Sequence, residues 1–239
     1  MSNIVFLVGE GEYGSEDSLR WLAHELGENG HDVVYRVSDV LADMPDFPRS
    51  SFGDLSPLDN ADLLVLFIRF RQLPDNEMEA LRRYVDRGGS ILAFRTTSHP
   101  FRFDESSPWQ EWNRFGEQVL GTGWVSHHGR DTSTQVTVSR PDHPVTRGLP
   151  DGFGARSWLY RVSLLPDCDV LLHGVSVGDP DDPQPQPVAW VREHRGGRIV
   201  FSTLGHAEDF DSEDVRRLLL NATTWLTTRS ISASWAGVT

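Results

Sequence analysis

Three stretches rich in consecutive apolar residues constrain the fold of this chain more than any other feature. They are Ile4–Val8, Ala61–Ile68 and Ile91–Phe94. A strand buried on both faces has such a continuous run, because neither face meets water. Strand–helix alternation at this spacing predicts right-handed crossovers between parallel strands. We therefore predict an α/β fold with a mostly parallel, doubly wound sheet and helices on both of its faces.

The remaining pattern supports a single domain over residues 1–228. Helical spacing of leucines predicts a helix over Ser15–Glu28, and a second helix begins at Pro74 and ends at the Gly88–Gly89 pair. A hairpin is expected around Arg195–Gly197, followed by a last helix over about Asp211–Leu226. We also expect a loop over Asp39–Leu58, which has several prolines, and a helix over Pro108–Leu120. Residues 229–239 have no apolar stripe, so we expect a poorly ordered tail.

Composition excludes several classes of partner. The formal net charge of −13 argues against nucleic acid, since phosphate binding needs a basic surface. No apolar run approaches membrane-spanning length, and the N-terminus lacks the basic region of a signal peptide. Cys168 is the one cysteine, so no disulfide framework can form, which suits a reducing, cytoplasmic location.

Polar residues follow several of the predicted strands. In an open parallel sheet, ligands bind in the crevice beyond the carboxyl ends of the strands. On this basis the ligand-binding candidates are Glu10, Glu12, Arg69 and Arg95. We add Trp124 and His128 from the less regular middle of the chain. Aromatic rings beside charged groups are what a sugar-binding cleft needs, although packing in the core explains a tryptophan equally well.

His206 and Glu208 form a His-x-Glu pair after the late hairpin. A histidine can act as general base near neutral pH, and a carboxylate can orient its ring. The alternative is that Glu208 belongs to the acidic first turn of the last helix, with His206 as a hydrogen-bonded loop residue.

The stretch Arg95–His99 breaks a buried strand with small polar residues. Thr96 or Thr97 could be a nucleophile if His99 or His206 served as its base, or the hydroxyls could bind a polar ligand. The alternative is a structural turn whose hydroxyls satisfy backbone groups. The absence of cysteine at this turn argues against cysteine-based amide chemistry.

A divalent metal is a further alternative, and no other cofactor is expected. His127, His128 and His206 are the candidate ligands, with His99 and Glu208 able to complete a set of three. Adjacent histidines point in different directions, which weakens this interpretation.

The C-terminal run from Gln186 to Leu226 resembles the ThuA (trehalose utilization) family. The features that carry the resemblance are Pro187-x-x-Trp190, Gly197-Arg198, Leu204-Gly-His206 and Trp225. The stretches FRTTSHPF, FGEQVLGTGWVSHHG and HPVTRGLP resemble one subgroup of that family.

This resemblance implies a flavodoxin-like three-layer sandwich related to class I glutamine amidotransferases. Thr96 or Thr97 would then stand where those enzymes have cysteine, so glutaminase activity is not expected. The family is associated with sugar catabolism, which implies a sugar or keto-sugar as ligand and hydrolysis or related acid/base chemistry. Two alternatives remain open: a non-catalytic binding or regulatory module, and a metal-dependent hydrolase. The tryptophan-rich middle also leaves a homo-oligomer open.

Overall fold

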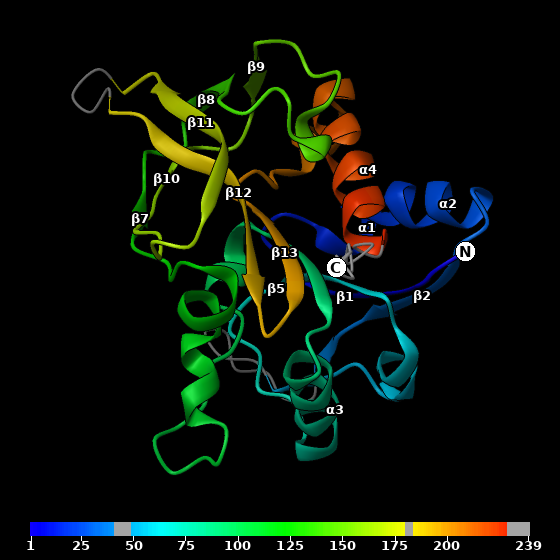
Figure 1. Cartoon of the computed structure of the whole chain (residues 1–239). Helices are drawn as coiled ribbons and strands as arrows, with labels where there is room; N and C mark the ends of the chain where they lie inside the picture. The colour runs from blue at the N-terminus through cyan, green and yellow to red at the C-terminus, as the bar shows by residue number, and fades with distance from the viewer. Residues whose placement is uncertain (41–48, 180–183, 229–239) are drawn as a thin grey trace, which may run out of the picture.

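The computed structural model describes residues 1–40, 49–179 and 184–228 (Figure 1). The predicted tail over 229–239 lies outside these residues, as does the beginning of the proline-rich loop that starts at residue 180.

A mixed sheet runs through the centre of the described chain. One half is parallel, in the spatial order β2 (Asp32–Val37), β1 (Asn3–Gly9), β5 (Leu63–Ile68), β6 (Ser90–Phe94) and β13 (Gly197–Ser202). The other half is antiparallel and continues with β12 (Gln186–His194), β11 (Asp169–Val177), β8 (Ser133–Val138) and β9 (Gly152–Ala155).

The α/β fold class is confirmed, but the expectation of a mostly parallel sheet is wrong for the second half. The reason lies in the β12–β13 connection, where His194 pairs with Gly197 across a two-residue turn. Arg195 and Gly196 have φ of 52° and 83°, the positive values that a tight hairpin turn of this kind requires. So short a connection can join only antiparallel strands.

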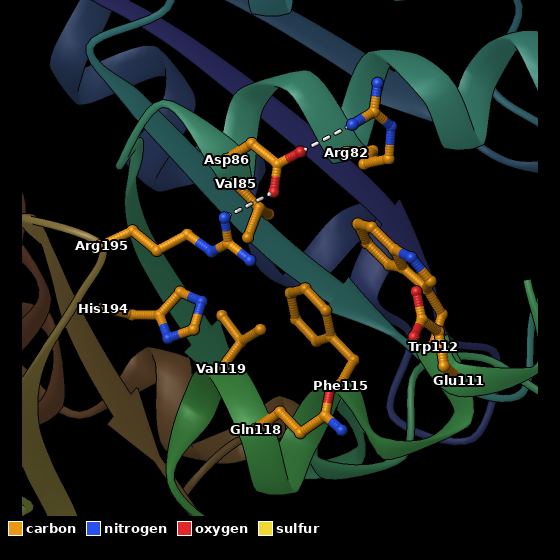
Figure 2. A pocket seen from close by; sticks show the side chains of 10 residues that line it. All are labelled: Arg82, Val85, Asp86, Glu111, Trp112, Phe115, Gln118, Val119, His194 and Arg195. Carbon is orange, nitrogen blue, oxygen red and sulfur yellow. Dashed lines mark hydrogen bonds and ion pairs between the residues drawn. The ribbon is translucent and has the colours of Figure 1, made fainter.

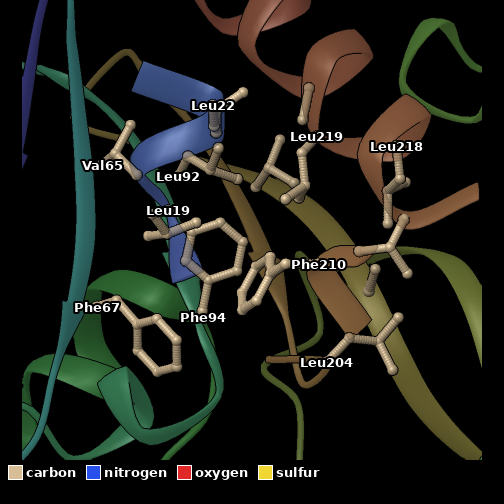
Figure 3. Close-up of a cluster of buried hydrophobic side chains, with 14 of the residues drawn as sticks. Leu19, Leu22, Val65, Phe67, Leu92, Phe94, Leu204, Phe210, Leu218 and Leu219 are labelled. Carbon is tan, nitrogen blue, oxygen red and sulfur yellow. The ribbon is translucent and has the colours of Figure 1, made fainter. Parts of the chain in front are cut away.

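Helices cover both faces of the sheet because its central strands are apolar on both sides. Along β1, Ile4, Phe6 and Val8 belong to one buried cluster, while Val5 and Leu7 belong to the other. The first cluster packs under α2 (Arg20–Glu28) and α4 (Glu213–Thr227), and it includes Leu19, which separates α2 from the short helix α1 (Ser15–Ser18) (Figure 3). The second packs under α3 (Asp75–Asp86) and the 3₁₀ turn η1 (Ser56–Asn60).

Local structure departs from expectation in three places. The predicted helix over Ser15–Glu28 is divided at Leu19, whose φ is −101°. The segment after β2, expected as loop, contains the short strands β3 (Asp39–Val40) and β4 (Ser50–Ser51) in its described part. The helix expected before Gly121 is a 3₁₀ turn, η3 (Gln110–Arg114), and a π turn, η4 (Gly116–Leu120).

The described chain also contains five shorter elements that have not been named above. They are η2 (Arg95–Ser98), β7 (Ser126–His127), η5 (Pro144–Thr146), β10 (Tyr160–Arg161) and η6 (Ala207–Asp211). None of the helices in the described residues combines the length and apolar character that crossing a bilayer would require.

Candidate functional site

A cavity of about 220 Å³ opens where the carboxyl ends of β1, β5 and β6 meet. Its lining residues are Glu12, Tyr13, Arg69, Phe70, Thr96, His99, Trp124, His127, Arg130 and Tyr160. This is the edge at which open α/β sheets bind ligands. Six residues singled out from the sequence therefore come together here: Glu12, Arg69, Thr96, His99, Trp124 and His127.

Two residues beside this cavity have a strained backbone. Phe70, after β5, has φ of 51°, and Arg95, directly after β6, has φ of 40°. Non-glycine residues at positive φ are uncommon, and they concentrate at functional sites. In a nucleophile elbow the nucleophile itself occupies the strained turn between strand and helix. In this chain the strained residue is Arg95, not Thr96 or Thr97, and a guanidinium is not a nucleophile.

The Arg95 side chain lies beneath the cavity and is fully buried. Its Nη1 donates hydrogen bonds to the carbonyl oxygens of Trp158 (3.1 Å) and Thr203 (2.9 Å). The guanidinium carbon is 4.3–4.7 Å from the ring centroids of Tyr13, Trp158 and Tyr160. Aromatic faces attract a cation at this range. Arg95 thus places a positive charge directly under two of the rings that line the cavity.

The two threonines of the elbow have different environments. The Thr97 hydroxyl donates to the carbonyl of Leu66 and accepts from the N–H of Ile68, so it ties η2 to β5. Thr96 lines the cavity and is 2 % exposed, and its hydroxyl has no hydrogen-bond partner among the described residues. A buried polar group is normally satisfied, so this hydroxyl is suited to a bound ligand.

His99 forms part of the cavity wall between Phe70 and Trp124. Its ring centroid is 4.8 Å from that of Phe70 and 5.7 Å from that of Trp124, and Nδ1 is 3.0 Å from Ser98 Oγ. Burial, and secondarily the charge of Arg69, lowers the pKa of His99 to about 3. The imidazole is therefore neutral throughout the physiological range.

The depressed pKa of His99 predicts an acid sensitivity that can be measured. In the unfolded chain a histidine titrates near 6.5, so between pH 6.5 and about 3 the unfolded state binds more protons. The free energy of unfolding should fall as the pH drops through this window, by up to about 1.4 kcal/mol per pH unit. Urea titrations of the wild type and of His99→Gln between pH 7 and 4 test this, and parallel pH profiles would contradict it.

Two carboxylates and two arginines form a network at the mouth of the cavity. Glu12 contacts Arg69 Nη1 at 2.7 Å through Oε2 and Arg130 Nη2 at 3.0 Å through Oε1. Glu10 is buried and accepts from the N–H groups of Glu12 and Tyr13, with Arg69 Nε 3.4 Å away. Burial raises the pKa of Glu10, while these N–H groups and Arg69 act in the opposite direction. Glu10 therefore shapes the loop, and Glu12 faces the ligand space.

His206 lies beside the cavity without lining it. Its ring is 6.3 Å from Tyr13 and 5.9 Å from Trp158, and its Nδ1 accepts from the Glu208 N–H at 3.3 Å. The Glu208 carboxylate is 68 % exposed and stands 3.9 Å from Nδ1. Since Nδ1 is an acceptor, the neutral ring carries its proton on Nε2 and is a donor there.

Asp209 is the buried carboxylate of this loop, and the sequence reasoning missed its role. It accepts from the N–H groups of Arg156, Ser157, Gly205 and His206 and from the Ser157 hydroxyl. One carboxylate thus ties η6 to the segment that carries Trp158.

The adjacent histidines point in different directions, as expected. His127 lines the cavity, and its Nδ1 is 2.5 Å from the His128 carbonyl oxygen. A carbonyl only accepts, so Nδ1 is the donor and Nε2 of the neutral ring has a free lone pair. His128 is buried and its Nδ1 is 2.8 Å from Asp179. Within residues 1–40, 49–179 and 184–228, no three His, Cys, Asp or Glu side chains converge closely enough to hold a metal ion.

Tyr160 and Arg130 also line the cavity but were not predicted. Tyr160 reaches it because β10 pairs with β7, which places Tyr160 opposite His127. These strands are two residues long, too short for a periodic signal.

A larger cavity, of about 370 Å³, lies between α3, the η3–η4 segment and the β12–β13 turn (Figure 2). Three of its charged groups form ion pairs, because Arg82 and Arg195 both reach Asp86, at 2.8 and 3.1 Å. It lies where β13 begins, at the edge opposite to the one that binds ligands in such sheets. We therefore take the smaller cavity as the candidate functional site.

The family model described as ThuA, trehalose utilisation, matches residues 7–226. The chain belongs to the ThuA family. Solved structures of similar fold include a ThuA-like protein from Parabacteroides merdae, which is 17 % identical, with 95 % of this chain and 90 % of that chain covered and a TM-score of 0.67.

A cytoplasmic protein from Salmonella typhimurium is 16 % identical, with 94 % of this chain and 98 % of that chain covered and a TM-score of 0.58. A β-galactosidase from Rahnella sp. is 14 % identical, with 94 % of this chain but 31 % of that chain covered and a TM-score of 0.54. At these identities the similarity concerns the fold alone. No curated protein matches the sequence.

Proposed function

We propose that this ThuA-family protein binds a sugar or keto-sugar in the 220 Å³ cavity and acts on it by acid/base chemistry. The observation that carries the proposal is the lining itself, which combines the rings of Tyr13, Trp124 and Tyr160 with charged groups and an unpaired hydroxyl. Aromatic faces pack on the apolar faces of sugar rings, and convergent polar groups orient the hydroxyls.

The proposed general base is His127. Its Nδ1–H is held by the His128 carbonyl, so the lone pair of Nε2 is the part of the ring available to a proton of the ligand. Thr96 would hydrogen-bond the reacting group, and His206 would support the site from beside Tyr13. Positioned acid/base groups of this kind contribute about 10²–10⁴-fold to a rate.

A non-catalytic binding module is the second candidate. Two observations favour it: Arg95 occupies the strained elbow, and the Thr97 hydroxyl is engaged by backbone groups. The two candidates differ in one outcome, because only the enzyme converts a bound ligand into product.

A thermal-shift screen with mono- and disaccharides and their keto derivatives tests the proposal. Any ligand that raises the midpoint is incubated with the protein, and the mixture is analysed for product by mass spectrometry. Product formation supports the enzyme, binding without product supports the module, and no binding by any sugar-like compound contradicts both.

The His127→Gln substitution tests the role of the base. Turnover of a substrate found in the screen should fall about 10²–10⁴-fold with binding preserved, because glutamine retains polarity but cannot take up a proton. The matched control is His24→Gln, which changes a histidine outside the cavity. Turnover within threefold of the wild type in His127→Gln would exclude this base.

The proposal includes two further properties, which are the arrangement of the parallel strands and the location of the protein in the cell. A flavodoxin-like, doubly wound arrangement is supported by the order of the parallel strands, β2-β1-β5-β6-β13, which is the flavodoxin order 2-1-3-4-5 in chain sequence. A cytoplasmic location is supported by the Salmonella typhimurium protein reported above and by a second protein of similar fold from the same organism, both described as cytoplasmic.

A further inference from the structure

We propose that the ligand of this cavity is a monosaccharide-sized acid whose single carboxylate is held near Arg69 and Arg130. This inference rests on the proposed function and narrows it, from sugars in general to anionic sugar derivatives.

The first support is the balance of charge around the cavity. Arg69 and Arg130 line it, and Arg95 lies beneath Tyr13 and Tyr160. Glu12 and the buried Glu10 oppose these three cations. A histidine is either neutral or positive, so the two histidines of the lining cannot offset the difference. Among these five groups the cations outnumber the carboxylates by one, within a protein whose net charge is −13.

The second support is the hydroxyl of Thr96, which lines the cavity and has no hydrogen-bond partner among the described residues. A hydroxyl can donate to an acceptor oxygen of a ligand. Arg95 is fully buried beneath Tyr13 and Tyr160 and does not line the cavity, so it acts on a ligand through its charge alone. A ligand with acceptor oxygens and a negative charge suits both groups.

The third support is that the mouth already holds a carboxylate between two guanidinium groups. Glu12 bridges Arg69 and Arg130 with one oxygen on each. Each guanidinium has five N–H donors in a planar fork, so these contacts leave donors on both. Arg130 is 70 % exposed, which allows its side chain to turn toward a second carboxylate. A volume of about 220 Å³ suits a single sugar ring.

The test compares matched acid and neutral probes by calorimetric titration and thermal shift. D-Glucuronate and D-galacturonate are measured against D-glucose and D-galactose at one ionic strength and at pH 7.5. We expect at least tenfold tighter binding of a uronate than of its parent sugar. Arg130→Gln should reduce this preference below threefold. Glu12→Gln should increase it, because it removes the competing negative charge.

Arg83→Gln is the matched control, because Arg83 is an exposed arginine that pairs with Asp59 and lines neither this cavity nor the one beside it. Equal or tighter binding of the neutral sugars would overturn this inference and leave the proposed function intact. A preference unchanged in both Arg130→Gln and Glu12→Gln would overturn it as well. If none of the four probes binds, the inference is wrong, and these simple sugars are also excluded as ligands for the proposed function.

Discussion

Replacing Arg95 with alanine should destabilise the protein by about 3–5 kcal/mol, as judged by the free energy of unfolding in urea. The side chain is fully buried, so the substitution leaves a cavity beneath Tyr13, Trp158 and Tyr160. It also leaves the carbonyl oxygens of Trp158 and Thr203 without the donor that joins them. Those carbonyls belong to segments that are far apart in the sequence and that Arg95 holds at one edge of the sheet.

Two further substitutions separate the roles of Arg95. Arg95→Lys keeps the charge but not the planar fork of N–H donors. Its free energy of unfolding should therefore lie between those of the wild type and Arg95→Ala. Arg95→Met fills a similar volume but has neither a charge nor hydrogen-bond donors. Any loss of stability in Arg95→Met beyond the loss in Arg95→Lys therefore measures the contribution of the buried cation. Arg114→Ala, at an exposed arginine, should leave the unfolding curve unchanged. A loss below about 1 kcal/mol in Arg95→Ala would show that the elbow does not depend on this side chain.

Replacing Asp209 with alanine should cost at least about 3 kcal/mol of stability, because hydrogen bonds to a charged acceptor are worth about 1.5–3 kcal/mol each. This carboxylate accepts from Arg156 N at 2.6 Å, Gly205 N at 3.0 Å and His206 N at 3.1 Å. The backbone N–H of Ser157 donates to it at 3.2 Å, and the Ser157 hydroxyl donates to it at 2.5 Å. Its loss should also displace His206 from its place beside Tyr13 and Trp158.

The neighbouring aspartate provides the control. Asp211 lies in the same η6 turn, but its side chain is 82 % exposed and its contact with Arg216 is 3.4 Å. Asp211→Ala should therefore unfold at the same urea concentration as the wild type. Equal midpoints for Asp209→Ala and Asp211→Ala would contradict the role assigned to the buried carboxylate.

Much of the parallel half of the fold could be predicted from the sequence. Ile4–Val8 and Ile91–Phe94 lie within β1 and β6, because strands buried on both faces need continuous apolar runs. The antiparallel half could be predicted only in part. The Arg195–Gly196 turn signalled one hairpin, whereas β9, a Gly-rich edge strand, has no comparable pattern.

For the site, the sequence determined which loops meet, since the carboxyl ends of parallel strands share one edge of the sheet. That reasoning brought Glu12, Arg69, Thr96 and His99 to one cavity. The tertiary structure alone decided what each side chain does there. Whether Thr96 or Thr97 is unpaired, and whether Asp209 or Glu208 is buried, depends on contacts with segments more than 25 residues away in the chain. These partners cannot be predicted from the neighbouring sequence, because hydrogen bonding and burial are determined only when distant segments pack together.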